Sequence, residues 1–239
     1  SHLSAELKEI KSHRDIQRQN RENSSTPVAA IVGYTNAGKS TLLNRLTDAG
    51  VLSEDKLFAT LDPTTRALQL PNGEKVLMTD TVGFIRKLPH NLIEAFRSTL
   101  EEAKYADIII HVVDCSNDDY ERHMSTVYDT LNQLEVKDKP VITLFNKCDE
   151  FEEIPILKDS KADYVENISA RTGMGIDSFL MDVQDIILKS RIQIERVFPY
   201  SDAGKIQLIR EYGQLESEEY TQDGIKVKGY VPAWVGGKL

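Results

Sequence analysis

The chain has 239 residues with a formal net charge of −9, and 40% of its residues are hydrophobic. That length allows one full-sized domain with appendages, and the composition is ordinary for a globular protein. The acidic balance argues against a protein that coats DNA or RNA without sequence preference, because such proteins are basic.

Residues 1–26 predict a polar linker helix. Leu3, Leu7, Ile10 and Ile16 give it only a thin apolar stripe among mixed charges. So narrow a stripe cannot be buried within the helix alone, so we expect the helix to pack against another domain or protein. A solvated linker explains these residues better than an RNA-binding arm.

Strand and helix patterns alternate through residues 27–191, which predicts an α/β fold with a mostly parallel, doubly wound sheet. Several strands are continuous apolar runs, such as Ile108–Val113, and strands of this kind are covered on both faces. His111 in this run is expected to be a hydrogen-bonded core residue rather than a catalyst. The predicted strands are Val28–Val32, Arg66–Leu70, Lys75–Thr79, Asp107–Asp114, Val141–Phe145 and Tyr164–Ile168. The predicted helices are Lys39–Asp48, Leu92–Lys104, Asp119–Glu135 and Ile176–Lys189.

Residues 192–239 predict a small α+β domain with the element order β-α-β-β. Its elements are a strand Gln193–Phe198, a helix Asp202–Tyr212 capped by Asp202, and a hairpin of Gln214–Thr221 with Ile225–Val231. A unit this small is expected to be stable only when it packs against another part of the protein or against a partner. Its sequence contains no pattern that indicates a catalytic site.

The segment between the first predicted strand and helix, GYTNAGKS, matches the phosphate-binding pattern G-x-x-x-x-G-K-[ST]. Gly33 and Gly38 allow tight turns, so that successive amides and the positive end of the next helix face an anion. Lys39 is expected to reach the β- and γ-phosphates of a nucleotide, and the Ser40 hydroxyl to bind Mg²⁺. The predicted phosphate-binding residues are Gly33, Tyr34, Thr35, Asn36, Ala37, Gly38, Lys39, Ser40 and Thr41.

The next candidate, Phe58–Thr65, is too polar and too broken by proline to form a regular element. A threonine here can give its hydroxyl to Mg²⁺ and its amide to the γ-phosphate, and would then sense the third phosphate. Thr60, Thr64 and Thr65 are all candidates, and Thr60 is chosen for its distance along the chain from Ser40. The predicted nucleotide contacts are Phe58, Ala59, Thr60, Leu61 and Asp62, with Thr60 also a metal ligand.

The sequence DTVG follows the predicted strand Lys75–Thr79. Asp80 at a strand end suits water-mediated Mg²⁺ binding, and the Gly83 amide can contact the γ-phosphate. The predicted nucleotide contacts here are Asp80, Thr81, Val82 and Gly83, and the predicted catalytic set is Lys39, Thr60 and Gly83.

Asn146, Lys147 and Asp149 form an N-K-x-D pattern after the strand Val141–Phe145. The Asp149 carboxylate can accept from both N1–H and N2–H₂ of guanine. Adenine lacks this donor pair and would leave the carboxylate unpaired, so the pattern predicts a preference for guanine. Asn146 can bond the base edge and tie back to the glycine loop, while the Lys147 stem covers the ring face.

Ser169, Ala170 and Arg171 follow the strand Tyr164–Ile168 and offer backbone amides to guanine O6. With these five motifs in order, residues 28–191 resemble a translation-factor-class small GTPase domain. The forms GYTNAGKST, FATLDPTTR, DTVGFI and FNKCD are similar to those of the HflX family of ribosome-associated GTPases. The resemblance extends to the preceding helix and to the C-terminal domain. Family members carry an N-terminal domain before that helix, so we expect a truncated chain.

The resemblance implies GTP and GDP as ligands, Mg²⁺ as cofactor, and docking on the ribosomal large subunit, with a role in splitting stalled ribosomes. We expect a monomer that binds no DNA and has no transmembrane segment. Cys115 and Cys148 form no disulfide framework and the five histidines lack the spacing of a zinc site, which favours a reduced, cytoplasmic compartment. Peripheral membrane association is left open.

Two positions bear on the rate of hydrolysis. Phe84 stands where many GTPases place a glutamine that orients water, so we expect slow turnover until a partner reshapes Phe84–Leu92. Asn36 resembles the loop asparagine of GTPases that hold K⁺ beside the phosphates, and an ordinary variable loop position explains it equally well.

Two other functions stay open. GTP can gate association with a protein or membrane partner unrelated to ribosomes. The chain can also be a GTPase subunit of an RNA-modifying complex, a class that shares the asparagine-bearing loop and dimerises with nucleotide. Simple ATPase activity is disfavoured by Asp149.

Overall fold

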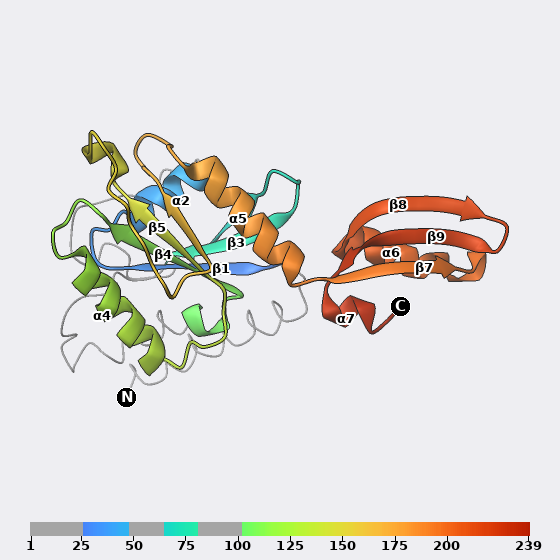
Figure 1. The fold of residues 1–239 in the computed structure, drawn as a ribbon. Coiled ribbons are helices and arrows are strands. Elements are labelled where there is room, and N and C mark those ends of the chain that lie inside the picture. The colour runs from blue at the N-terminus through green and yellow to red at the C-terminus, as the bar shows by residue number, and fades with distance from the viewer. Residues whose placement is uncertain (1–25, 48–64, 81–101) are drawn as a thin grey trace, which may run out of the picture. The chain divides into compact units, whose positions relative to one another are not determined.

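The computed structural model describes residues 26–47, 65–80 and 102–239 (Figure 1). The predicted linker helix, residues 58–64 of the threonine segment and the segment after Asp80 lie outside these residues, as does most of the predicted helix Leu92–Lys104. Thr65, one of the three candidate threonines, is the first residue of a strand, and its hydroxyl bonds that of Thr79 at 3.1 Å. The chain separates into two compact units. The first unit is Pro27–Asp185, and the second contains Ile186–Leu239.

The first unit holds a six-stranded sheet in the order β2-β3-β1-β4-β5-β6. Neighbouring strands are parallel except β2 and β3, which pair antiparallel. The strands are β1 (Val28–Gly33), β2 (Thr65–Gln69), β3 (Lys75–Asp80), β4 (Ile108–Asp114), β5 (Val141–Asn146) and β6 (Tyr164–Asn167). The predicted mostly parallel sheet is therefore confirmed, with strand ends that differ from the prediction by at most one residue.

Helices cover both faces of this sheet. Figure 1 shows α4 on one face and α2 and α5 on the other. Their bounds are α2 (Lys39–Thr47), α4 (Tyr120–Gln133) and α5 (Ile176–Lys189), and a 3₁₀ turn, η1, spans Cys148–Glu150. Among the helices of the described residues, none combines the length and the apolar character needed to cross a membrane.

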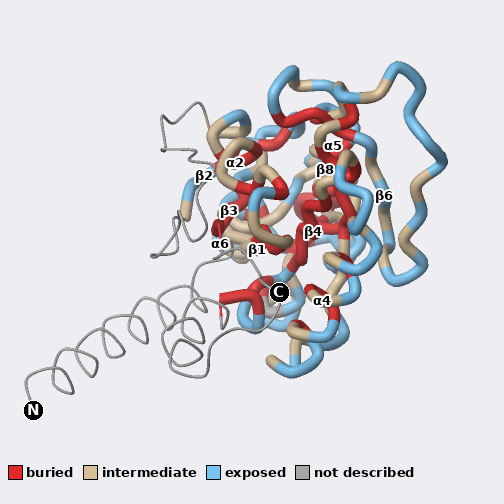
Figure 2. The backbone as a smooth tube through the Cα atoms, turned by 90° about the vertical axis from the view of Figure 1, so that its left-hand side faces the viewer, coloured by how far each residue is buried: buried red, intermediate tan, exposed pale blue. Residues whose placement is uncertain are grey.

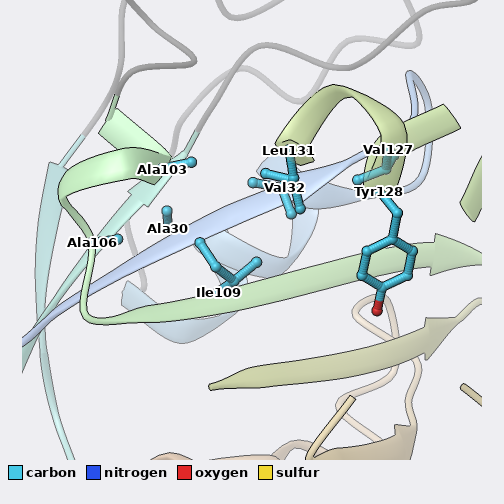
Figure 3. Close-up of a cluster of buried hydrophobic side chains, with 8 residues drawn as sticks. All are labelled: Ala30, Val32, Ala103, Ala106, Ile109, Val127, Tyr128 and Leu131. Atoms are coloured by element: carbon cyan, nitrogen blue, oxygen red, sulfur yellow. The ribbon is translucent and has the colours of Figure 1, made fainter. Parts of the chain in front are cut away.

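The core lies where α4 packs on β1 and β4 (Figure 3). Val127 and Leu131 of the helix meet Val32 of β1 and Ile109 of β4, and both strand residues are fully buried. Figure 2 shows buried backbone running through the central strands. Burying a β-branched or leucine side chain contributes about 1.5–3 kcal/mol, so these apolar runs fix the sheet that carries the site.

His111 of β4 departs from the prediction. It is buried, at 1% exposure, but its Nδ1 atom has no hydrogen-bond partner among the described residues. The expected fully hydrogen-bonded histidine is therefore wrong for this nitrogen. The ring stands edge-on to that of Tyr128, with centroids 5.0 Å apart. Burial lowers the pKa of His111 to about 4, so the ring is neutral at pH 7.

The second unit has the predicted β-α-β-β order. Its elements are β7 (Ile192–Phe198), η2 (Tyr200–Asp202), α6 (Ala203–Tyr212), β8 (Gln214–Thr221), β9 (Gly224–Val231) and a last helix α7 (Ala233–Gly236). The three strands form an antiparallel sheet in the order β7-β9-β8, with its own core around Phe198, Ile209 and Val227. Asp202 stands at the N-cap of α6 but makes no capping hydrogen bond; its carboxylate pairs with Lys205 at 3.3 Å. The predicted capping hydrogen bond is therefore wrong: Asp202 ends η2 with φ −102° and ψ 18°, whereas a capping residue is normally extended.

Candidate nucleotide site

The predicted site residues that the structure describes gather at one edge of the six-stranded sheet. They follow β1, β3, β5 and β6, and parallel strands direct their carboxyl ends to a common edge. Those present are Gly33, Tyr34, Thr35, Asn36, Ala37, Gly38, Lys39, Ser40, Thr41, Asp80, Asn146, Lys147, Asp149, Ser169, Ala170 and Arg171. Phe58, Ala59, Thr60, Leu61, Asp62, Thr81, Val82 and Gly83 lie outside the described residues.

The glycine loop needs its glycines because other backbone and side chains approach it closely. A Cβ atom on Gly33 would lie 2.3 Å from the Val112 carbonyl oxygen, and one on Gly38 would lie 2.2 Å from Asn146 Nδ2. Gly38 also has φ +93°, a conformation that side chains rarely adopt. The loop leads directly into α2, so its amides and the positive helix end lie together, as an anion site requires.

Lys39 is buried and bonded back to the glycine loop that precedes it. Its Nζ donates to the Tyr34 carbonyl at 3.0 Å, and the residue is only 7% exposed. Burial lowers the pKa of Lys39 to about 8, and the nearby Asp80 carboxylate opposes that shift. A phosphate beside this ammonium would supply the negative charge that favours its charged form.

Ser40 and Asp80 form an oxygen pair that fits a magnesium ion. The Ser40 hydroxyl donates to Asp80 Oδ2 at 2.9 Å, and Asp80 is 1% exposed. Within the described residues, no group of three or more His, Cys, Asp or Glu side chains could hold a metal. Mg²⁺ is commonly held by few protein oxygens together with substrate phosphates, so this pair beside a phosphate loop suits it.

Asn146 joins the glycine loop to the loop after β6. Its Nδ2 donates to the Ala37 carbonyl at 2.8 Å, and its Oδ1 accepts from the Ala170 amide at 2.9 Å. The side chain is buried, at 3% exposure. The predicted tie from Asn146 to the glycine loop is confirmed. The Ala170 amide, predicted to face guanine O6, is held by Asn146 in this structure.

Asp149 lies in η1, beside Ser169 and Arg171. The Ser169 hydroxyl, with the Arg171 guanidinium as a smaller influence, holds the pKa of Asp149 below its usual value. Arg171 also forms an ion pair with the Asp149 carboxylate. The carboxylate is thus ionised at pH 7 and able to accept from a planar pair of N–H donors.

Three contacts at the site were not predicted from the motifs. Lys147, in a left-handed conformation with φ 71°, donates to Asp114 at 2.7 Å. The Tyr34 ring stacks on His123 of α4, with centroids 3.8 Å apart. Arg45 of α2 donates to the carbonyls of Ala170 and Arg171. Asp114 directly follows the apolar run Ile108–Val113, and an acidic residue at a strand end is a signal that the sequence offers. No sequence pattern marks the other two contacts.

Residues 28–147 match the family model for 50S ribosome-binding GTPases. Two curated relatives, both named GTPase HflX, come from Lacrimispora saccharolytica and Caldanaerobacter subterraneus subsp. tengcongensis. The first is 60% identical over 231 residues and the second 44% identical over 237 residues, which is 97% and 99% of this chain. These matches confirm the resemblance to the HflX family. The chain spans about half the length of these relatives, 55% and 54%.

Among solved structures, a GTP-binding protein from Sulfolobus solfataricus in complex with GDP has a similar fold. The TM-score is 0.56 at 25% sequence identity, and the match covers 78% of this chain and 60% of that one. The α/β fold with a phosphate-binding loop is thus supported by both sequence and structural relatives.

Proposed function

Because the chain belongs to the family of 50S ribosome-binding GTPases, we propose that its first unit binds GTP and GDP with Mg²⁺ and hydrolyses GTP. The observation that carries this proposal is the position of Asn146, bonded at once to the glycine loop at Ala37 and to the loop of Ala170. One side chain thereby ties a phosphate-binding loop to the loop beside Asp149. Phosphates and base of a single nucleotide need that pairing of loops.

The predicted site residues have separate roles in this proposal. The loop amides and Lys39 bind the phosphates, and Asp149 accepts from N1–H and N2–H₂ of guanine. Water attacks the γ-phosphorus, the bond to the β-phosphate oxygen breaks, and GDP and phosphate leave. Thr60 and Gly83 are proposed to contact the γ-phosphate, and Phe84 offers no group to orient the water, so turnover by the chain alone is slow.

Ser40 and Asp80 are proposed to hold Mg²⁺ together with Thr60 and phosphate oxygens. The ion would supply positive charge to the phosphate oxygens as negative charge develops on them. Asn36, exposed and left-handed with φ 62°, is the proposed contact for K⁺. Hydrolysis rates that are equal in K⁺ and Na⁺ would remove that second ion from the proposal.

We further propose that the GTP-bound chain associates with the large ribosomal subunit in the cytoplasm and leaves it after hydrolysis, as a monomer that splits stalled ribosomes. The family model, described as 50S ribosome-binding, supports the partner. Residues 1–26 would form a linker helix, 27–191 the GTPase domain, and 192–239 a separate small α+β domain.

Two measurements test the proposal. Calorimetry should give binding of GDP and GTP but not of ADP or ATP at the same concentrations. GTP turnover should be slow for the chain alone and rise with purified large ribosomal subunits. Equal binding of adenine nucleotides contradicts the guanine site. Turnover unchanged by ribosomes favours a GTP-gated module with another partner, and nucleotide-driven dimers in K⁺ favour an RNA-modifying complex.

A further inference from the structure

Arg45 connects the helix that follows the phosphate loop to the loop that follows β6. It lies in the last turn of α2, and its Nε atom donates to the Ala170 carbonyl at 3.2 Å. A second guanidinium nitrogen donates to the Arg171 carbonyl. The guanidinium also covers the turn that follows, since a Cβ atom on Gly173 would lie 3.9 Å from Arg45 Cζ.

These bonds fix two consecutive peptide units. In a trans peptide the C=O and the next N–H point in opposite directions, so a bond to the Ala170 carbonyl sets the direction of the Arg171 N–H. The Ala170 N–H is held separately, by Asn146 Oδ1 at 2.9 Å. Ser169 anchors the start of the turn, because its hydroxyl accepts from the Thr172 amide at 3.1 Å and its carbonyl accepts from the Gly173 amide at 2.8 Å.

Arginine suits this position for a chemical reason. Its guanidinium carries several N–H donors in one rigid plane and no acceptor, so it can serve two adjacent carbonyls at once. A lysine ammonium at the same place is a point donor on a flexible stem. Asn146 at the end of β5 holds the loop from the sheet edge, and Arg45 holds it from the α2 side.

We propose that Arg45 is a positioning residue for guanine recognition: it holds the loop of Ser169, Ala170 and Arg171 so that the Arg171 amide faces the 6-oxygen of the base. This inference rests on the proposed function of the site. It assigns to α2 a second task besides phosphate binding, because the same helix then supports recognition of the base. Arg45 itself touches neither the phosphates nor the reacting atoms.

The test measures dissociation constants of the full chain for GDP, IDP and 6-thio-GDP. IDP lacks the 2-amino group that Asp149 reads, whereas 6-thio-GDP replaces the 6-oxygen with a weaker acceptor. Arg45→Ala is expected to weaken GDP binding about 2- to 12-fold, the loss that follows from misdirecting one hydrogen bond to the 6-oxygen of the base. The preference for GDP over 6-thio-GDP should collapse toward one, while the preference for GDP over IDP should stay as in the wild type.

Arg122→Ala is the matched control, because Arg122 is an exposed arginine on α4 and is expected to leave all three constants unchanged. Arg45→Lys keeps a cation and one donor, so its constants should lie between those of wild type and Arg45→Ala. Unchanged GDP binding in Arg45→Ala overturns the inference, and so does a loss that is equal for GDP and 6-thio-GDP. Wild-type protein that does not prefer GDP to ADP contradicts the proposed function itself, which separates the two failures.

Discussion

Asn146→Ala removes a side chain that makes two buried hydrogen bonds at the centre of the site. The Ala37 carbonyl and the Ala170 amide, its partners at 2.8 and 2.9 Å, belong to residues that are 0% and 3% exposed. A buried polar group left without a partner costs about 1–3 kcal/mol, so two such groups should lower the free energy of unfolding by about 2–6 kcal/mol. That is a large part of the roughly 5–15 kcal/mol that stabilises a typical domain.

Urea denaturation followed by far-UV circular dichroism measures the change in the free energy of unfolding, and calorimetry with GDP measures the loss of nucleotide binding. Asn167→Ala is the control, because Asn167 is an exposed asparagine at the end of β6 and its replacement should leave the unfolding curve nearly unchanged. A loss of less than about 1 kcal/mol in Asn146→Ala would refute the reasoning, since the two loops would then not depend on this side chain.

Gly38→Ala should weaken GDP binding and lower the unfolding free energy by about 1–3 kcal/mol, because the side chain is strained at φ +93° and its Cβ would lie 2.2 Å from Asn146 Nδ2; wild-type affinity would contradict this. Asp149→Asn should shift the preference from GDP toward XDP at least about tenfold in competition binding, because the amide matches the 2-oxo group of xanthine. His111, with a folded pKa of about 4 below its ordinary 6.5, takes up its proton more readily when unfolded, so stability should fall as pH drops from 6.5 to 4. Relative to His111→Gln, wild type should lose up to about 3 kcal/mol over that window in denaturation curves, and parallel pH profiles would exclude the effect.

The sheet could be predicted because its signal is local. Runs such as Ile108–Val113 alternate with helical patterns, and a continuous β-branched run is stable only when both faces are covered. The phosphate loop could also be predicted from a local signal, the spacing of its two glycines before Lys39 and Ser40. The structure shows why glycine is needed there: the Val112 carbonyl lies against Gly33 and the Asn146 side chain against Gly38. The hydrogen bond from Asn146 to the glycine loop could be predicted from the N-K-x-D pattern at the end of β5.

Contacts between distant elements could not be predicted in this way. Arg45 stands in an ordinary helical sequence, and its partners Ala170 and Arg171 lie 125 and 126 positions further along the chain. An exposed arginine on a helix usually faces water, so nothing in its spacing indicates two backbone acceptors. The Nδ1 atom of His111, which has no hydrogen-bond partner in the part of the chain that the structure describes, could not be predicted either, because buried polar groups are normally hydrogen-bonded.

The interaction energies of Arg171 and Asn146 differ enough to show which of the two side chains a bound base can displace. The ion pair of Arg171 with Asp149 has an arginine side chain that is 74% exposed, and exposed pairs contribute only about 0–1 kcal/mol. The bonds of Asn146 are buried, and losing them costs several times more. Guanine, with two N–H donors aimed at the same carboxylate, can therefore displace the Arg171 side chain cheaply while Asn146 stays in place. Because Arg45 holds the Arg171 carbonyl and not its side chain, this exchange leaves the backbone of the loop where the base needs it.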